Sequence, residues 1–173
     1  FGPEDEFFNR FAGMTRLSPV VPVIGADTLF QPVYVDDVAH AAEMVVVGDA
    51  AAGVYELGGP DVESFRALMK RMLDVVHRRR LVLAVPMFAA KIMAFAFDIL
   101  QSVTLGLVKN GVVTRDQVKN LGNDNVVAEG AKGFDALGIA PVSMSSVLPD
   151  YLWRFRPSGQ YDDIMASAKD LRS

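Results

Sequence analysis

The stretch FQPVYVDDVA, residues 30–39, decides how this chain is expected to fold. Its first half is rich in β-branched and aromatic side chains and predicts an extended segment, which Pro32 restricts to an edge or irregular strand. Asp36 and Asp37 then favour a helix start, because carboxylates cap free N–H groups and complement the positive end of the helix dipole. We therefore predict a strand that runs directly into a helix over residues 38–47.

The same alternation of short strands and amphipathic helices continues on both sides of this stretch. Apolar runs predict strands, and apolar residues at positions i, i+3, i+4 and i+7 predict helices. The helix after Ser64 is the clearest, because serine is a good N-cap and a regular apolar face follows it. Strands are expected at residues 20–24, 54–57 and 81–85, and helices at residues 3–13 and 64–77. This alternation is typical of an α/β fold.

Helices dominate the second half of the chain. Its most unusual segment, residues 86–108, is apolar and long enough to cross a bilayer, but Lys91, Asp98 and Gln101 interrupt it. Two interpretations stay open: a helix buried between domains, or a helix that rests on a membrane or on a partner subunit. Shorter helices are expected at residues 114–122, 131–137 and 143–155, with a kink or restart at Pro149.

The composition excludes several classes of site. The 173 residues include no cysteine and only two histidines, which are far apart in the sequence. Disulfides, thiol nucleophiles and cysteine-ligated zinc are therefore excluded, and no metal site is predicted. The formal charge of −4 argues against a nucleic-acid partner, which would require a basic surface.

The motifs that nucleotide-dependent catalysis requires are missing from this sequence. No glycine-rich phosphate-binding turn follows a strand, and no tyrosine is followed four residues later by the lysine that would lower its pKa. Asp36 and Asp37 are interpreted as capping residues rather than as an acid–base pair. The arginines of residues 78–80 are interpreted as a solvated cluster at a helix end, with anion binding as the alternative. No catalytic residue is predicted.

Several segments together resemble the extended short-chain dehydrogenase/reductases of the NAD-dependent epimerase/dehydratase superfamily. Phe1-Gly2-Pro3 resembles the strand end and turn that follow the family's catalytic helix, and residues 30–39 resemble its stretch R-D-F-V-H-V-D-D-V-A. Residues 55–60 and 64–68 resemble the strand, turn and helix start that come next. The resemblance implies the C-terminal portion of a doubly wound, NAD(P)-binding Rossmann-like protein, with this chain beginning inside a longer sequence.

On this resemblance, residues 1–173 are a single C-terminal domain. Residues 1–85 are expected to form the end of the α/β sheet region, and residues 86–173 a mostly helical cap and tail. The resemblance places Phe1, Gly2 and Pro3 at the cofactor and Phe30, Gln31 and Tyr34 in the substrate cleft.

Two departures from the family pattern argue against a nucleotide-sugar substrate. Phe30 stands where many members have an arginine that contacts the diphosphate, and Gln31 replaces the aspartate that follows. With Asp124-Asn125-Val126-Val127, the chain is more similar to an atypical branch of the family. That branch includes the nucleotide-binding accessory subunit of respiratory complex I and its bacterial relatives.

Membership of that branch implies a structural NAD or NADP in the complete protein and no catalysis by this chain alone. It also implies contacts with respiratory complex subunits or the membrane surface through residues 86–108, and a location in the cytoplasm or peripherally on the inner membrane. Two alternatives are an active NAD(P)-dependent reductase or isomerase that acts on a small or lipid-like substrate, and an interaction domain without nucleotide. The isolated chain is also expected to expose a sheet edge and to self-associate.

We predict that this chain alone binds NAD(H) and NADP(H) only weakly. The pyrophosphate site of such proteins belongs to the first strand–turn–helix unit, whose glycine-rich turn this sequence lacks. Calorimetric titration with the oxidised and reduced forms of both nucleotides should give no saturable binding in the micromolar range. A micromolar dissociation constant for any of them would contradict the prediction.

Overall fold

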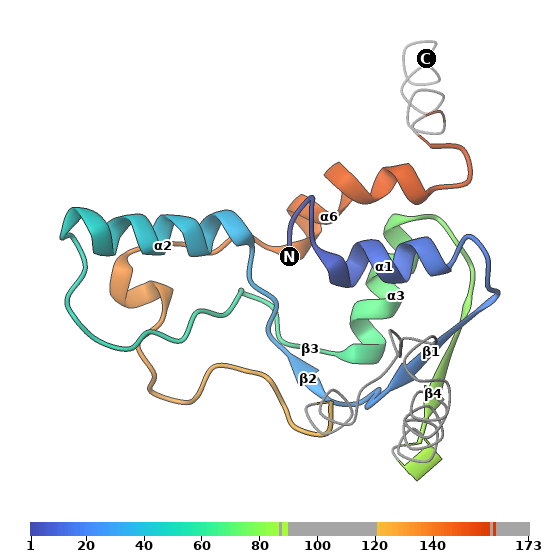
Figure 1. Cartoon of the computed structure of the whole chain (residues 1–173), viewed down its shortest axis with the longest axis horizontal. Helices are drawn as coiled ribbons and strands as arrows, with labels where there is room; N and C mark the ends of the chain where they lie inside the picture. Colours follow the sequence, from blue (N-terminus) through green and yellow to red (C-terminus); the bar gives the residue numbers. More distant parts are fainter. Residues whose placement is uncertain (87, 90–120, 160, 162–173) are drawn as a thin grey trace, which may run out of the picture.

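A computed structural model describes residues 1–86, 88–89, 121–159 and 161 of the chain. Helices alternate with short strands in its first half, and helix α6 and two 3-10 helices lie in its second half (Figure 1). The elements in chain order are α1 (Glu6–Met14), β1 (Val20–Ile24), β2 (Leu29–Phe30), α2 (Val35–Val47), β3 (Glu63–Ser64), α3 (Phe65–Val75), β4 (Leu81–Val85), η1 (Phe134–Leu137), α6 (Met144–Leu152) and η2 (Trp153–Phe155). This mixture of helices with a small parallel sheet agrees with the expected α/β class.

Strands β1 and β4 form a parallel pair, with Val20 opposite Leu81 at its start. Both strands have the bounds predicted from the sequence, and α2 and α3 lie within the long crossover that a parallel pair requires. The Leu81 N–H donates to the Pro19 carbonyl at 3.0 Å. In a parallel ladder, every second residue of a strand turns its main-chain N–H and C=O groups toward the partner strand. Pro19 turns toward β4, so Pro22, three residues further along, turns its main-chain groups away from β4, and its missing N–H removes no hydrogen bond from the ladder. The ladder therefore tolerates a proline in the middle of β1.

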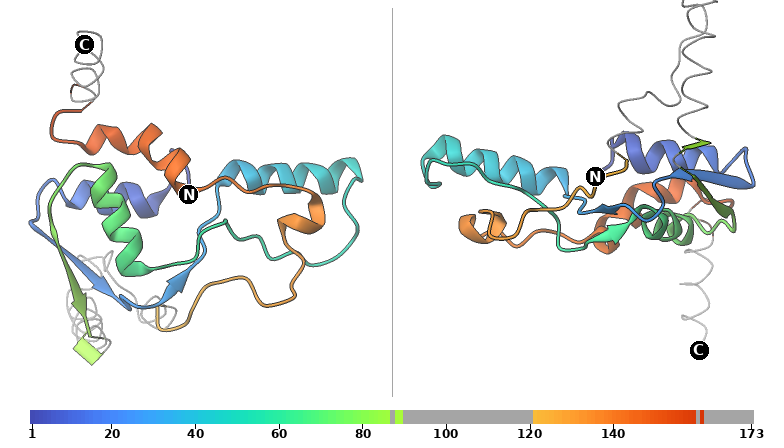
Figure 2. Two further views of the ribbon diagram at one scale, coloured as in Figure 1. Left: turned by 180° about the vertical axis from the view of Figure 1, so that it is seen from behind. Right: turned by 90° about the horizontal axis from the view of Figure 1, so that it is seen from below.

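Helices α1, α3 and α6 pack together beside the β1–β4 pair, where the main core lies (Figures 1 and 2). Helix α3 is buried along one face, because Leu68, Met69 and Met72 recur at helical spacing and are at most 1% exposed. Other fully buried side chains of this core are Phe8, Val21, Val23, Val76, Met144, Leu148 and Leu152. Burial of these apolar groups is the dominant favourable term in the folding of this part.

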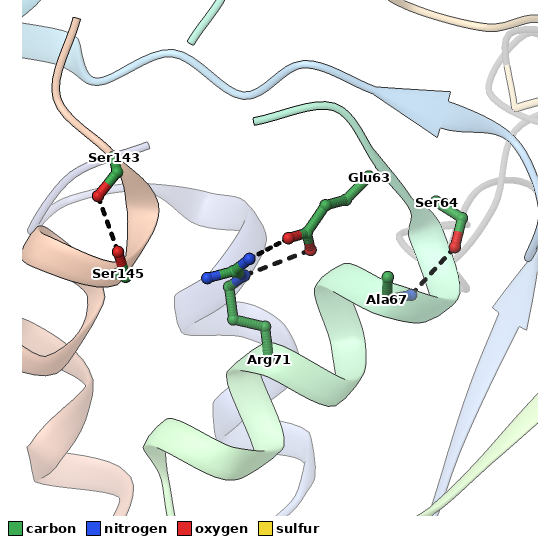
Figure 3. Close-up of polar contacts among 6 residues, drawn as sticks. All are labelled: Glu63, Ser64, Ala67, Arg71, Ser143 and Ser145. Carbon is green, nitrogen blue, oxygen red and sulfur yellow. Dashed lines mark hydrogen bonds and ion pairs between the residues drawn. The ribbon is translucent and has the colours of Figure 1, made fainter. Parts of the chain in front are cut away.

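Two of the polar contacts shown in Figure 3 hold the start of α3. The Ser64 hydroxyl accepts a hydrogen bond from the Ala67 N–H at 3.2 Å, which confirms its predicted role as N-cap. Arg71, two turns further along, forms a two-pronged ion pair with Glu63 of β3. Both side chains are partly buried, and the planar guanidinium matches the carboxylate geometry. The pair therefore ties β3 to the helix that follows it.

Strand β2 lies between two other segments of the chain. It pairs antiparallel with β3, and Phe30 also bridges to Asn125 in parallel orientation. The Leu121 carbonyl oxygen accepts from the Thr28 hydroxyl at 2.6 Å and lies 2.2 Å from where a side chain on Gly25 would begin. Because Gly25 also has a φ of +65°, only glycine suits this turn. The chain thus returns at residue 121 to the turn that follows β1.

Helix α2 extends away from the main core, with η1 beside it (Figures 1 and 2). It begins three residues earlier than predicted, at Val35, so Tyr34 occupies the N-cap position and Asp36 and Asp37 lie in the first turn. The Tyr34 carbonyl accepts from the Val38 N–H at 3.3 Å, and the Val35 N–H is already bonded to the Phe1 carbonyl at 2.9 Å. A second, smaller core joins α2 to η1 through Ala41, Phe134, Leu137 and Ile139.

Three other predictions from the sequence need correction. Residues 54–57 form no strand: the Glu56 N–H donates to the Lys132 carbonyl, but this contact does not extend into a ladder among the described residues. The helix expected at residues 131–137 is reduced to the 3-10 helix η1. Helix α6 continues through Pro149 and becomes the 3-10 helix η2 only after Leu152, so the chain does not restart a helix at Pro149, and a kink there stays a prediction.

The helices predicted at residues 86–108 and 114–122 lie almost wholly outside the described residues. Phe88, near the start of the first segment, is described and is 68% exposed. Within the described ranges, no helix is both long and apolar enough to cross a bilayer.

We predict that the isolated chain self-associates through strand β4. Leu81 and Leu83 are 63% and 49% exposed, and the described residues supply no partner strand for the second edge of β4. An unpaired edge with apolar side chains invites pairing with another chain. Light scattering of the pure chain should show a dimer or a larger species, and Leu83→Lys should shift it toward the monomer.

Leu17→Lys is the matched control, because Leu17 is 94% exposed but lies outside the sheet. A monomer over a wide concentration range would refute self-association, and equal responses to the two substitutions would show that β4 is not the interface.

Candidate functional site

A groove of about 280 Å³ lies between the start of α1 and strand β2. Its lining combines aromatic rings with a few polar groups. The lining residues are Phe1, Asp5, Glu6, Phe7, Phe8, Phe30, Gln31, Pro32, Leu68 and Asn125. The groove thus brings together Phe1, which was predicted at the cofactor, and Phe30 and Gln31, which were predicted in the substrate cleft.

Main-chain hydrogen bonds hold Phe1 against the segment that follows β2. Its nitrogen donates to the Val33 carbonyl at 2.6 Å, and its carbonyl accepts from the Val35 N–H at 2.9 Å. Phe1 thus bonds to the residues on either side of Tyr34, which is the hydrogen-bond pattern of two parallel strands. The Phe1 and Tyr34 rings lie 5.6 Å apart between centroids. Tyr34 contacts Phe1 but does not line the groove, and the hydrogen bond from its hydroxyl to Asp36 raises the pKa of Tyr34.

Gly2 and Pro3 line a separate hollow of about 490 Å³. A side chain on Gly2 would begin 2.8 Å from Cγ1 of Val35, so the absence of one allows the turn to approach α2 closely. All three residues predicted at the cofactor therefore line this hollow, and Phe1 borders the groove as well. Asp5 likewise lines both.

The Phe30 ring belongs to an aromatic cluster beside the groove. It meets the Phe65 ring edge-on at 5.6 Å between centroids, and Phe65 also contacts Phe7 and Phe11. Such aromatic pairs typically stabilise a fold by about 1 kcal/mol beyond the area that they bury. The half-buried Phe30 ring therefore packs among other rings, where an arginine would lose this contact.

The Gln31 side chain joins three segments. Its Nε2 donates to the Gly59 carbonyl at 2.8 Å, and its Oε1 accepts from the Val127 N–H at 3.0 Å. The fit is tight, because a side chain on Gly58 would begin 2.5 Å from the Gln31 amide carbon and one on Gly59 would lie 1.9 Å from the Pro32 carbonyl oxygen. Gln31 lines the groove, but its amide is already engaged in holding these segments together.

Asp5 borders both hollows and links two helices. It is the N-cap of α1, since its Oδ1 accepts from the Phe8 N–H at 2.6 Å and the Asn9 N–H at 3.2 Å. Its Oδ2 accepts a hydrogen bond from the buried hydroxyl of Tyr151 in α6. Burial and this bond raise the pKa of Tyr151, so the phenol stays protonated at neutral pH and cannot serve as a base. The sequence carries no local signal for a contact between such distant positions.

Asp37 has a role that corrects the capping interpretation. It is buried in the first turn of α2, and its Oδ2 accepts from the Val142 N–H at 2.8 Å, so it holds the chain just before α6. His40, one turn further along, is exposed. In the part of the chain that the structure describes, no three histidine, aspartate or glutamate side chains are arranged to hold a metal ion.

The arginines after α3, which were interpreted as a solvated cluster, instead include two that bind main-chain carbonyl groups of other elements. The Arg78 Nε donates to the Phe155 carbonyl at 2.8 Å, and the Arg80 Nε donates to the Thr15 carbonyl at 3.0 Å. Each guanidinium thus satisfies a carbonyl oxygen at the end of another helix. These arginines hold η2 and the end of α1 against the end of α3.

Comparison with known proteins identifies relatives that match nearly the whole chain. No protein-family model matches it. It is 32% identical, over 91% of its length, to the NADH dehydrogenase (ubiquinone) 1 alpha subcomplex subunit 9, mitochondrial, of Arabidopsis thaliana. The chain is a homologue of this complex I subunit. It is also 25% identical over 99% of its length to the Neurospora crassa NADH-ubiquinone oxidoreductase 40 kDa subunit, and 28% identical over 90% to the subunit 9 of Rattus norvegicus.

These homologues belong to the NAD-dependent epimerase/dehydratase superfamily, which confirms the resemblance seen in the sequence. The homologous region is 40% of the length of the Arabidopsis protein and 44% of the Neurospora protein. The chain therefore spans less than half the length of these curated relatives.

We predict that Phe30→Arg destabilises this homologue without creating a nucleotide-sugar site. The substitution removes the ring contact with Phe65 and places a charge in a half-buried position. Glu63, opposite it in the β2–β3 pair, is already paired with Arg71. The free energy of unfolding of Phe30→Arg should fall by about 1–3 kcal/mol relative to the wild type. Phe30→Leu should lower it less, because leucine keeps the position apolar.

Urea unfolding of the wild type and both variants measures the stability. Titration of the same three proteins with a UDP-sugar measures nucleotide-sugar binding. Unchanged stability of Phe30→Arg together with tight binding of the sugar nucleotide would mean that the groove is a nucleotide-sugar pocket.

Proposed function

We propose that this chain is part of an accessory subunit of a respiratory complex I, in which a bound NAD or NADP has a structural role. The observation that carries the proposal is the 32% identity over 91% of the chain to a subunit of a mitochondrial NADH dehydrogenase. The absence of a glycine-rich turn and of a tyrosine–lysine pair in the sequence agrees with a part that does not itself catalyse hydride transfer.

Phe1, Gly2 and Pro3 are proposed to lie at the edge of the nucleotide site. The hollow that they line also includes Glu4, Asp5 and Asp36, and no lysine or arginine. A pyrophosphate requires cations or free N–H groups, so the phosphates are expected to bind elsewhere in the longer protein. Only a part of the nucleotide that carries no phosphate suits this hollow.

Phe30, Gln31 and Tyr34 are proposed to build one wall of the adjoining cleft. Phe30 and Gln31 line the groove directly, whereas Tyr34 supports Phe1. Their rings and the engaged amide form a rigid wall, which suits positioning and packing better than proton transfer.

Contact with other subunits or with the membrane surface is proposed to involve residues 86–108. Most of this segment lies outside the described residues, but its apolar composition and the exposed ring of Phe88 support such a role. We accordingly propose a location at the periphery of the inner membrane in preference to the free cytoplasm.

A reductase or isomerase that acts on an apolar substrate is the second candidate function. The aromatic lining of the groove is the observation that favours it. In that case the catalytic acid and its cation would have to come from the remainder of the longer protein.

The proposal predicts that the complete protein, tagged in its own organism, co-migrates with NADH dehydrogenase activity when mild detergent extracts are separated on native gels. Phe88→Ser should weaken this association, because it removes an exposed ring from the proposed contact segment. Val54→Ser is the matched control, since Val54 is 85% exposed but lies between α2 and β3.

Migration of the wild-type protein entirely apart from the activity would refute membership of the complex. Co-migration that Phe88→Ser leaves unchanged would refute only the role of residues 86–108.

A further inference from the structure

The groove between α1 and β2 is acidic as well as aromatic. Asp5 and Glu6 carry the only charged side chains in its lining, and no lysine or arginine is among the lining residues. The amino group of Phe1 also borders the groove, but it donates to the Val33 carbonyl, and burial lowers the pKa of this amine. Phe1, Phe7 and Phe30 supply half-buried rings. The negative faces of aromatic rings and nearby carboxylates both attract cations and disfavour anions.

A helix start such as that of α1 could in principle bind an anionic ligand, because its first N–H groups lack partners within the helix. Here the Asp5 carboxylate already accepts hydrogen bonds from Phe8 and Asn9. Its second oxygen accepts from Tyr151 and from the Gly2 N–H at 3.4 Å. Two donors of this helix start, the Phe8 and Asn9 N–H groups, are therefore occupied by the protein's own carboxylate, whose negative charge also opposes an anion there.

The two amide side chains in the lining do not offset the negative charge of the groove. Both ends of the Gln31 side chain are bonded to the main chain, and Asn125 is neutral and exposed. Glu6 is exposed in the first turn of α1, and Arg10, one turn further along, does not line the groove. Glu6 is thus the charged group best placed to meet a ligand at the mouth of the groove.

We propose that this groove binds a ligand that has an apolar ring or short chain and a cationic end, and that it rejects phosphate-bearing ligands. The rings would contact the apolar part, and the Glu6 and Asp5 carboxylates would attract the cation. The inference rests on the groove being a ligand cleft, as proposed above, but not on association with complex I subunits.

A matched pair of probes tests the charge preference directly: 3-phenylpropylamine and 4-phenylbutyrate share the phenylpropyl group and carry opposite charges at neutral pH. Titration of the whole chain, followed by calorimetry and by NMR shifts of the phenylalanine rings, should show the amine binding about tenfold tighter than the carboxylate. Glu6→Gln should reduce this ratio several-fold. Glu43→Gln, an exposed substitution on α2, should leave the ratio unchanged.

Phe30→Leu should weaken both probes by a similar factor, because it removes a ring without changing charge. Equal affinities for the two probes, a tighter carboxylate, or no binding of either would overturn the proposal. A ratio unaffected by Glu6→Gln, or affinities unaffected by Phe30→Leu, would place the binding elsewhere and would also overturn it. None of these outcomes depends on whether the protein co-migrates with NADH dehydrogenase activity.

Discussion

The Asp5 carboxylate closes the start of α1 and holds α6 against it. One oxygen satisfies the free N–H groups of Phe8 and Asn9, and the other accepts the buried Tyr151 hydroxyl. Without this partner the phenol would be buried unsatisfied, which typically costs about 1–3 kcal/mol. Because α1 and α6 share a core with α3, the packing of all three depends on this contact. The same carboxylate lines the neighbouring groove, so one group contributes both to the packing of the helices and to the charge of the groove.

Gln31 imposes a second constraint, which explains a departure from the family pattern. Its amide donates to the Gly59 carbonyl and accepts from the Val127 N–H, so it joins β2 to two segments distant in sequence. An ionised aspartate has no donor and a shorter reach, and it could not make both contacts. Together with the packing of Phe30 on Phe65, this amide makes the β2 side of the groove tightly packed.

The sequence by itself determined the elements whose signals are local. The apolar runs of β1 and β4 and the serine cap of α3 were predicted with their observed starts, because burial periodicity and capping act within one or two turns of chain. The resemblance carried by residues 30–39 also identified the superfamily that the homologues confirm. It placed Phe1 at the cofactor and Phe30 in the substrate cleft, and both assignments stay predictions, although the two residues line one groove.

Only the tertiary structure decided which distant groups meet. The carboxylates of Asp5 and Asp37 found partners in and just before α6, and Arg78 and Arg80 found carbonyl oxygens on other elements. Residues 54–57 have the composition of a strand but, among the described residues, they share one main-chain hydrogen bond with the segment at Lys132 and form no ladder with it. A strand forms only when a partner presents a matching row of main-chain groups, and a hydrogen bond across more than a hundred residues leaves no periodicity in the sequence.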